Sequence, residues 1–239
     1  MFIASFPAGP WQTSCYVLAT ASRSECVVID PGMGALDGVR DIVAEHHLKP
    51  VAAVLTHGHL DHMFSVAPLC AGYDATCWVH PDDRALLANP LAGMSADTEA
   101  LLAQLGSGTA FTEPDDVRLL ADGVRVEVAG LELDALHAPG HTPGSTMFRS
   151  AYAADDDVDS LLFSGDVLFA GSIGRVDLPG GSAESMVRSL RQMVLPLPDE
   201  VVVLPGHGPQ TTMAAERATN PYLQASFLGT GDPTDGARA

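Results

Sequence analysis

The stretch T-H-G-H-L-D-H at positions 56–62 places three histidines and an aspartate within six positions. Imidazole and carboxylate groups bind transition metals, and a set without thiolate suits Zn²⁺, with iron or manganese as alternatives. His57, His59 and Asp61 alternate, so in an extended backbone their side chains point to one side. His62 is expected to begin a helix and to point toward a second ion. The spacing predicts a metal site, and a plain polar loop is the alternative.

Three more polar residues stand next to predicted strands farther along the chain. His141 lies in H-A-P-G-H-T-P-G-S, Asp166 ends S-L-L-F-S-G-D, and His207 lies in P-G-H-G-P. The apolar run V-A-A-V-L-T likewise leads directly into the first histidines. Because strand ends at one edge of a sheet can converge, these loops are expected to meet at one site.

Asp166 is expected to be buried, because it ends an apolar strand and precedes Val167-Leu168-Phe169. A buried charge is costly unless a cation or several hydrogen-bond donors compensate it. Lys49 is the only lysine of the chain. A metal ion is therefore the more favourable partner for this carboxylate.

The composition limits the partners and the location of the protein. Its 239 residues are 46% hydrophobic, and 12 Lys+Arg against 30 Asp+Glu give a formal net charge of −18. Such a surface repels phosphate backbones, which argues against a nucleic-acid partner. The N-terminus lacks a basic segment, and no apolar stretch reaches the roughly 20 residues that span a bilayer. Four cysteines without C-x-x-C spacing, of which Cys15 and Cys26 are expected to be buried, indicate a reduced, cytoplasmic protein without a membrane partner.

Strands and helices are predicted in both halves of the chain. Strands are expected at 15–19, 26–30, 51–56, 76–79, 117–120, 124–128, 131–137, 145–149, 160–164 and 201–204. Helices are expected at 36–47, between 56 and 76, at 183–193 and at 212–219, with a loose helical segment within 89–115. This mixture predicts an α/β fold, an αββα sandwich or related layering. No linker or repeat divides the chain, so residues 1–239 are expected to form a single domain.

The four motifs together resemble the metallo-β-lactamase superfamily. They are T-H-G-H-L-D-H, H-A-P-G-H-T-P-G-S, F-S-G-D-V-L-F and L-P-G-H-G, and they occur in that order. Within the superfamily the chain is most similar to the compact bacterial glyoxalase II type, the hydroxyacylglutathione hydrolases. The similarity runs from the N-terminal strands to the closing A-E-R-A-T-N-P-Y-L.

The resemblance implies a site with two divalent metal ions, most readily zinc. One ion would be held by His57, His59 and His141, the other by Asp61, His62 and His207, with Asp166 bridging them. In such enzymes a metal-bound hydroxide attacks a carbonyl carbon, and Asp61 and Asp166 are the expected catalytic carboxylates. A thiolate leaving group needs little protonation, so no separate general acid is required.

The glycine-rich stretch 171–182 is where the chain departs from the larger glyoxalase II enzymes. Those enzymes have a lysine and a tyrosine there for glutathione, and the matching positions here are Arg175 and Asp177. Arg175 is expected either to meet a substrate carboxylate or to pair with Asp177. The helical C-terminal domain that supplies further basic contacts is also not expected in this chain. Both departures argue against glutathione as the carrier thiol.

The leading function is hydrolysis of a small-molecule thioester of a hydroxy acid, of the S-lactoyl-thiol type. An alternative is a persulfide dioxygenase with one iron on His57, His141 and Asp166, and a lactonase or a catalytically silent binding protein are further alternatives. RNA-processing relatives are disfavoured by the negative charge. The oligomeric state stays open. Of the other histidines, His137 is expected either to support the site or to pack beside it.

Overall fold

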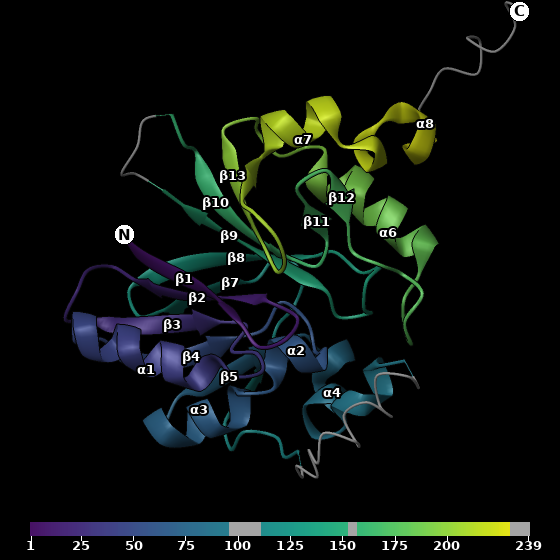
Figure 1. Cartoon of the computed structure of the whole chain (residues 1–239). Helices are drawn as coiled ribbons and strands as arrows, with labels where there is room; N and C mark the ends of the chain where they lie inside the picture. The colour runs from purple at the N-terminus through teal and green to yellow at the C-terminus, as the bar shows by residue number, and fades with distance from the viewer. Residues whose placement is uncertain (96–110, 153–156, 230–239) are drawn as a thin grey trace, which may run out of the picture.

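Two six-stranded sheets lie face to face, with helices against the outer face of each (Figure 1). This arrangement belongs to a computed structural model that describes residues 1–95, 111–152 and 157–229. The first sheet is built from strands between residues 2 and 119, and the second from strands between residues 125 and 212. The predicted αββα sandwich is confirmed.

The first sheet has its strands in sequence order. They are β1 (Phe2–Ala8), β2 (Thr13–Ala19), β3 (Glu25–Ile29), β4 (Lys49–Val54), β5 (Thr76–Val79) and β6 (Val117–Leu119). The first three strands pair antiparallel, and β3 to β6 pair parallel. Parallel neighbours need crossover connections, and helices α1 (Ala35–His46), α2 (Leu60–Met63), α3 (Val66–Tyr73) and α4 (Arg84–Ala88) lie in those connections.

The second sheet has the order β14-β13-β10-β9-β8-β7. Its strands are β7 (Arg125–Val128), β8 (Leu131–His137), β9 (Thr146–Ala151), β10 (Ser160–Gly165), β13 (Val201–Pro205) and β14 (Thr211–Thr212). Only β10 and β13 pair parallel. A separate hairpin, β11 (Leu168–Phe169) and β12 (Ser172–Ile173), precedes α6 (Ala183–Ser189). A π-helical turn (Leu190–Val194), α7 (Met213–Thr219) and α8 (Ala225–Leu228) complete this side.

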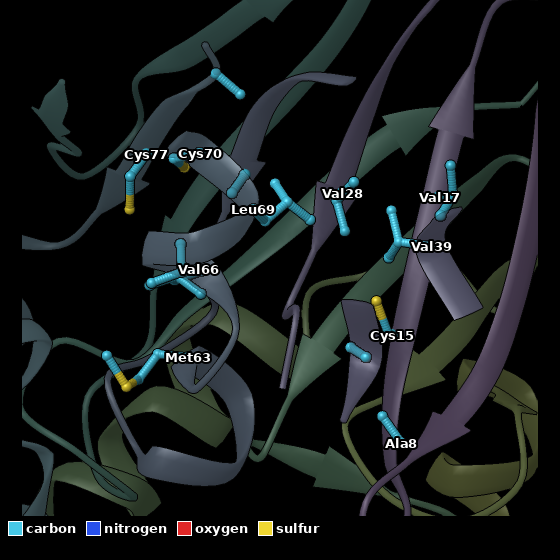
Figure 2. Close-up of a cluster of buried hydrophobic side chains, with 14 of the residues drawn as sticks. Ala8, Cys15, Val17, Val28, Val39, Met63, Val66, Leu69, Cys70 and Cys77 are labelled. Carbon is cyan, nitrogen blue, oxygen red and sulfur yellow. The ribbon is translucent and has the colours of Figure 1, made fainter. Parts of the chain in front are cut away.

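The strands are apolar on both faces because each sheet is covered on both sides. In β2, Cys15 and Val17 pack toward α1 and α3, while Tyr16 and Leu18 pack between the sheets. Figure 2 shows the outer core, in which Val39 of the first helix faces the side chains of the sheet. A third core lies between the second sheet and α6, the π-helical turn, α7 and α8. Each fully buried Leu or Phe of these cores contributes about 1.5–3 kcal/mol.

Several elements differ from the sequence prediction. Strand β1 was not predicted; its Pro7 is tolerated because β1 is an edge strand, where a missing N–H costs no ladder bond. Helix α2 begins at Leu60, so Asp61 projects from a helix, and the extended alternation applies only to His57 and His59. In the predicted loose segment 89–115, a 3₁₀ turn covers Pro90–Gly93, and residues 96–110 lie outside the described part.

Within the described ranges, no helix combines the length and the apolar character that crossing a membrane requires.

Candidate metal centre

The carboxyl ends of four strands, two of them neighbours, gather at one edge of the sandwich. β8 and β10 both pair antiparallel with β9, and β10 pairs parallel with β13, so these three strands end at the same edge. The end of β4 meets them from the other sheet, where the Thr146 amide donates to the Thr56 carbonyl over 2.8 Å. The Ser14 amide likewise donates to the Gly206 carbonyl over 2.7 Å. The predicted histidine and aspartate loops therefore converge.

His57, His59 and His141 form the first cluster of possible ligands, all of them buried. Nδ1 of His59 lies 2.8 Å from Nε2 of His141, and the ring centroid of His57 lies 4.8 Å from that of His59 and 4.7 Å from that of His141. His59 thus presents Nδ1 to the cluster and His141 presents Nε2.

Asp61, His62 and His207 form the second cluster. Nε2 of His207 lies 3.2 Å from Oδ2 of Asp61 and 3.3 Å from Nε2 of His62. Oδ2 of Asp61 lies 3.6 Å from Nε2 of His62 and accepts a hydrogen bond from the Thr13 hydroxyl over 3.0 Å. The side chain of His207 is 28% exposed, so this cluster is reachable from the surface.

Asp166 lies between the two clusters. Its Oδ1 is 3.3 Å from Nε2 of His62, and its Oδ2 is 3.5 Å from Nε2 of both His141 and His207. The expectation that its carboxylate is buried is correct, because the residue is only 9% exposed.

These residues fit divalent metal ions by two tests. Ligands at about 2.0–2.2 Å from a tetrahedral zinc ion lie about 3.3–3.6 Å from one another, and the distances around Asp166 and His207 are 3.2–3.5 Å. Nε2 of His57 and Oδ1 of Asp166 are also buried without a hydrogen-bond partner. Buried polar atoms of this kind are rare, and a cation would satisfy both.

Each of three histidines is oriented by a partner on its other ring nitrogen. Nδ1 of His141 lies 2.7 Å from the Arg175 carbonyl, and Nδ1 of His207 lies 3.1 Å from the Trp11 carbonyl. Nδ1 of His62 lies 2.9 Å from Oδ2 of Asp30. Such partners fix the tautomer with the proton on Nδ1 and leave Nε2 for a metal ion.

Asp30 is a site residue that the sequence prediction did not include. Its carboxylate also accepts hydrogen bonds from the Thr56 amide over 2.8 Å and from the Thr56 hydroxyl over 2.6 Å. Its φ is 49°, a left-handed conformation that aspartate tolerates better than most residues. An aspartate before Pro-Gly at the end of β3 was the available signal, because such positions favour sharp turns.

The two clusters differ in electrostatics. Burial and the His141 ring lower the pKa of His59 to about 3, and burial, with the His62 ring, lowers the pKa of His57 well below its usual value. For His62 burial acts in the same direction, but Asp166 and Asp61 raise its pKa well above the usual value. Burial thus dominates for His57 and His59 in the first cluster, whereas the neighbouring carboxylates dominate for His62 in the second.

A family model described as the metallo-beta-lactamase superfamily matches residues 8–207. The chain belongs to the metallo-beta-lactamase superfamily. Among sequence relatives, hydroxyacylglutathione hydrolase GloC of Haemophilus influenzae is 31% identical over 225 residues, covering 94% of this chain and 99% of that protein.

Three solved structures in the superfamily resemble the protein over most of its length. The B3 metallo-beta-lactamase BLEG-1 is 33% identical with a TM-score of 0.77, covering 93% of this chain and 99% of that one. TTHA1623 in a di-iron-bound form is 35% identical with a TM-score of 0.72, covering 93% and 100%. ETHE1 from Myxococcus xanthus is 26% identical with a TM-score of 0.71, covering 96% and 89%.

A cavity of about 410 Å³ opens beside both clusters of possible ligands. Its lining combines possible ligands, His59, Asp61, His141, Asp166 and His207, with the apolar side chains of Trp11, Met94, Phe169, Ile173 and Leu178. The cavity therefore offers both possible metal ligands and apolar contact.

Arg175 also lines the cavity, and of the two expectations for it the structure shows the pair with Asp177. Its Nε and Nη2 donate to the two carboxylate oxygens of Asp177 over 2.7 and 2.8 Å. The hydrogen bonds from Arg175 lower the pKa of Asp177 to about 2. The guanidinium charge at the cavity is therefore offset by its neighbour.

His80, Asp82 and His137 form another histidine and carboxylate group, away from the centre. The rings of His80 and His137 stack with centroids 4.0 Å apart and planes 10° apart. One ion cannot lie in the plane of both parallel rings, so this arrangement is unsuited to metal binding. His137 also contacts the Pro143 carbonyl through Nε2 over 2.8 Å, which supports the loop that carries His141.

Proposed function

We propose that the protein is a two-metal hydrolase that cleaves a thioester of a small hydroxy acid, of the S-lactoyl-thiol type. The observation that carries the proposal is the position of Asp166, whose carboxylate lies 3.3–3.5 Å from ring nitrogens of both histidine clusters. The similarity to hydroxyacylglutathione hydrolase GloC supports a thioester as substrate.

His57, His59 and His141 would hold one ion, Asp61, His62 and His207 the other, and Asp166 would bridge them. When bound, two such cations would activate a water molecule and polarise the thioester carbonyl. Zinc is the proposed metal because the ligands are imidazole and carboxylate. The similarity to the di-iron form of TTHA1623 supports iron as the second choice.

The residues of the chain would orient the reacting groups. The Thr13 hydroxyl holds Asp61, which lines the cavity, and Asp30 holds the buried ring of His62, so both side chains are fixed in direction. Trp11, Phe169 and Ile173 would bind the apolar parts of the substrate and exclude water around the carbonyl. The leaving thiolate needs no general acid, because the pKa of a thiol is lower than that of an alcohol.

The test combines metal analysis with substrate turnover. The purified protein is expected to contain two zinc or iron ions and to release free thiol from S-lactoylglutathione and from S-lactoyl esters of neutral thiols. His141→Ala is the control, because it removes one proposed ligand. Two bound ions without thioester turnover would contradict the proposed substrate, and lactone hydrolysis by the same sample would indicate a lactonase. A protein without metal or turnover would indicate a silent binding protein.

A mononuclear iron persulfide dioxygenase is the second candidate. The Gly174-Arg175-Val176-Asp177 loop and the similarity to ETHE1 from Myxococcus xanthus favour it. Its ligands would be His57, His141 and Asp166. One iron per chain and oxygen consumption with a persulfide would support it over the hydrolase.

We further propose a small-molecule partner, a single domain over residues 1–239 and a cytoplasmic location. The formal charge of −18 opposes binding to nucleic acid. All four cysteines are free and buried, as in proteins of reducing compartments.

A further inference from the structure

Asp83 is a fully buried carboxylate outside the clusters of possible metal ligands. It ends the 3₁₀ turn Pro81–Asp83 that follows strand β5, and its exposed fraction is 0%. A buried carboxylate is costly unless donors satisfy it, so its contacts indicate why it lies there.

The donors to Asp83 come from the two loops that carry the first histidine cluster. The Gly58 amide, between His57 and His59, donates to Oδ2 over 2.8 Å. From the other loop, directly after His141, the Thr142 hydroxyl donates to Oδ2 over 2.7 Å and the Gly144 amide donates to Oδ1 over 2.8 Å. One carboxylate thus joins both loops.

The two glycines leave the space that this arrangement needs. A Cβ at Gly144 would lie 2.6 Å from Cγ of Asp83 and 2.7 Å from its Oδ1. A Cβ at Gly58 would lie 2.8 Å from a Leu86 methyl carbon and 3.0 Å from the Asp83 carbonyl. A side chain at Gly144 would push its loop away from Asp83, so glycine there follows from the approach of that carboxylate, whereas at Gly58 the nearest atoms belong to Leu86.

The second cluster is held by other contacts. Asp61 is bonded to the Thr13 hydroxyl, and the rings of His62 and His207 are bonded to Asp30 and to the Trp11 carbonyl. None of these bonds involves Asp83. The clusters share one support, because Thr56 donates to Asp30 and also contacts Nδ1 of His57 over 3.1 Å. Within the described residues, the hydrogen bonds of the Asp83 carboxylate are, by contrast, all with the two loops of the first cluster.

We propose that Asp83 is a positioning residue that sets the distance from His57 and His59 to His141, and so controls the affinity of one metal position. It supplies no ligand itself. The inference goes beyond thioester hydrolysis, and it rests only on the proposed metal binding.

The test is zinc binding by Asp83→Asn, measured by competition with a coloured chelator and by metal content after desalting. The amide keeps the shape but turns one acceptor oxygen into a donor, which opposes either the Gly144 amide or the donors of Gly58 and Thr142. One zinc ion is expected to bind about tenfold or more weakly, the usual scale for changes behind the ligands, while the other binds as in the native protein. Asp82→Asn, one residue earlier on the same turn, is the matched control and should bind both ions normally.

A second substitution identifies the weakened position. In the Asp83→Asn background, His141→Ala should not lower the zinc content further, and His207→Ala should remove the remaining ion. Native affinity at both positions, or equal weakening of both, would overturn the proposal.

If Asp83→Asn does not fold, Thr142→Val removes a single donor and should weaken the same position by a smaller factor. An unchanged zinc affinity in that variant would overturn the proposal equally. If the native protein holds only one ion, the proposed two-metal function is wrong. The role of Asp83 is then still tested by whether Asp83→Asn loses that ion. Absence of thioester turnover would contradict the proposed substrate without affecting these binding measurements.

Discussion

At the scale of single residues, three aspartates near the centre differ in what they touch. Asp166 faces ring nitrogens of both clusters, Asp61 faces the cavity beside His207, and Asp30 lies behind His62 with no path to the cavity lining. Identical side chains thus differ in their proposed positions, bridging, terminal or supporting, because of their surroundings alone.

Replacement of Asp166 tests the bridging position. Asp166→Ala is expected to lower the content of both metals and to reduce kcat by more than the roughly 10–100-fold typical of changes behind the ligands. Metal analysis and thioester kinetics measure this, with Asp159→Ala, an exposed aspartate paired with Arg149, as control. Full occupancy and a native rate in Asp166→Ala would refute the bridge.

Asp177→Asn tests whether Arg175 is held away from anionic substrates. Without the Asp177 charge, the Arg175 guanidinium should be free to bind a carboxylate of S-lactoylglutathione, which should lower KM. The value of kcat should change little, because ground state and transition state share this contact equally. Arg175→Ala should raise the same KM. If KM is low in the native protein and neither variant changes it, a separate thiol pocket exists.

The pH dependence of the same pair follows from the lowered pKa of Asp177, about 2. A depressed carboxyl pKa means that the ion pair is complete at higher pH and is lost only as pH falls through about 2. KM for S-lactoylglutathione should therefore show no inflection from this pair between pH 5 and pH 9. An inflection that disappears in Asp177→Asn would contradict this assignment.

The seven proposed ligands were accessible from sequence because each lies in a short motif at a strand end. Asp83 had no such motif, and Asp30 had only the turn signal of Asp-Pro-Gly, since each is a single aspartate whose partners lie 25 to 61 residues away in the chain. Their roles depend on which loops the sheets bring together, and the spacing of residues along the chain does not predict which loops become neighbours.

At the scale of elements, helix α7 fastens the β11–β12 hairpin that forms one wall of the cavity. The buried Glu216 carboxylate accepts hydrogen bonds from the Gly171 amide, over 2.8 Å, and from the Asn220 side chain, over 2.8 Å. The Asn220 amide also donates to the Ser172 carbonyl over 3.0 Å. The hairpin leads to Arg175, whose carbonyl orients His141, so α7 supports the cavity from behind.

Glu216→Gln tests this support. An amide cannot accept at both of its heavy atoms, and the lost bond should cost about 1–2 kcal/mol, which lowers Tm by about 2–8 °C at this chain length. KM should rise more than kcat falls, because Phe169 and Ile173 line the cavity rather than the proposed metal positions. Thermal melting and kinetics measure this, with Glu184→Gln on the exposed face of α6 as control. Equal effects of both substitutions would argue against a specific anchor.

Most strands and helices were predictable because their apolar runs are bounded by Gly, Pro or Asp. The β11–β12 hairpin was not, because strands of two residues give no periodicity to detect, and the helix expected to begin at His62 begins at Leu60. The helix predicted at 183–193 starts as expected at Ala183 but changes to a π-helical turn after Ser189, which side-chain pattern does not distinguish from an α-helix.

At the scale of the whole molecule, the proposed ions contribute to stability. His57, His62 and Asp166 lie together at the join of the two sheets, and without cations Nε2 of His57 and Oδ1 of Asp166 stay desolvated and unpartnered. A ligand that binds only the folded state stabilises it in proportion to its affinity. Chelation should therefore lower Tm by several degrees, and added zinc should restore it. An unchanged melting curve after verified metal removal would show that the site is stable without ions.

The negative charge of the molecule should affect substrates according to their own charge. With a formal net charge of −18, the protein repels S-lactoylglutathione but not an S-lactoyl ester of a neutral thiol. Raising the ionic strength shortens the screening length, so KM for the glutathione ester should fall while KM for the neutral ester stays constant. A parallel response of the two esters would exclude this electrostatic effect.

The division of the chain into two consecutive sheets has a consequence for its assembly. His57, His59, Asp61 and His62 come from the half that contains the first sheet, and His141, Asp166 and His207 come from the other half. Neither half carries a full set for either proposed ion, so each ion would cross-link two parts of the chain that meet across the sandwich. A gene cut at the Asp122-Gly123 turn would then yield two fragments whose reassociation depends on zinc, and the protein would serve as a split reporter of that metal.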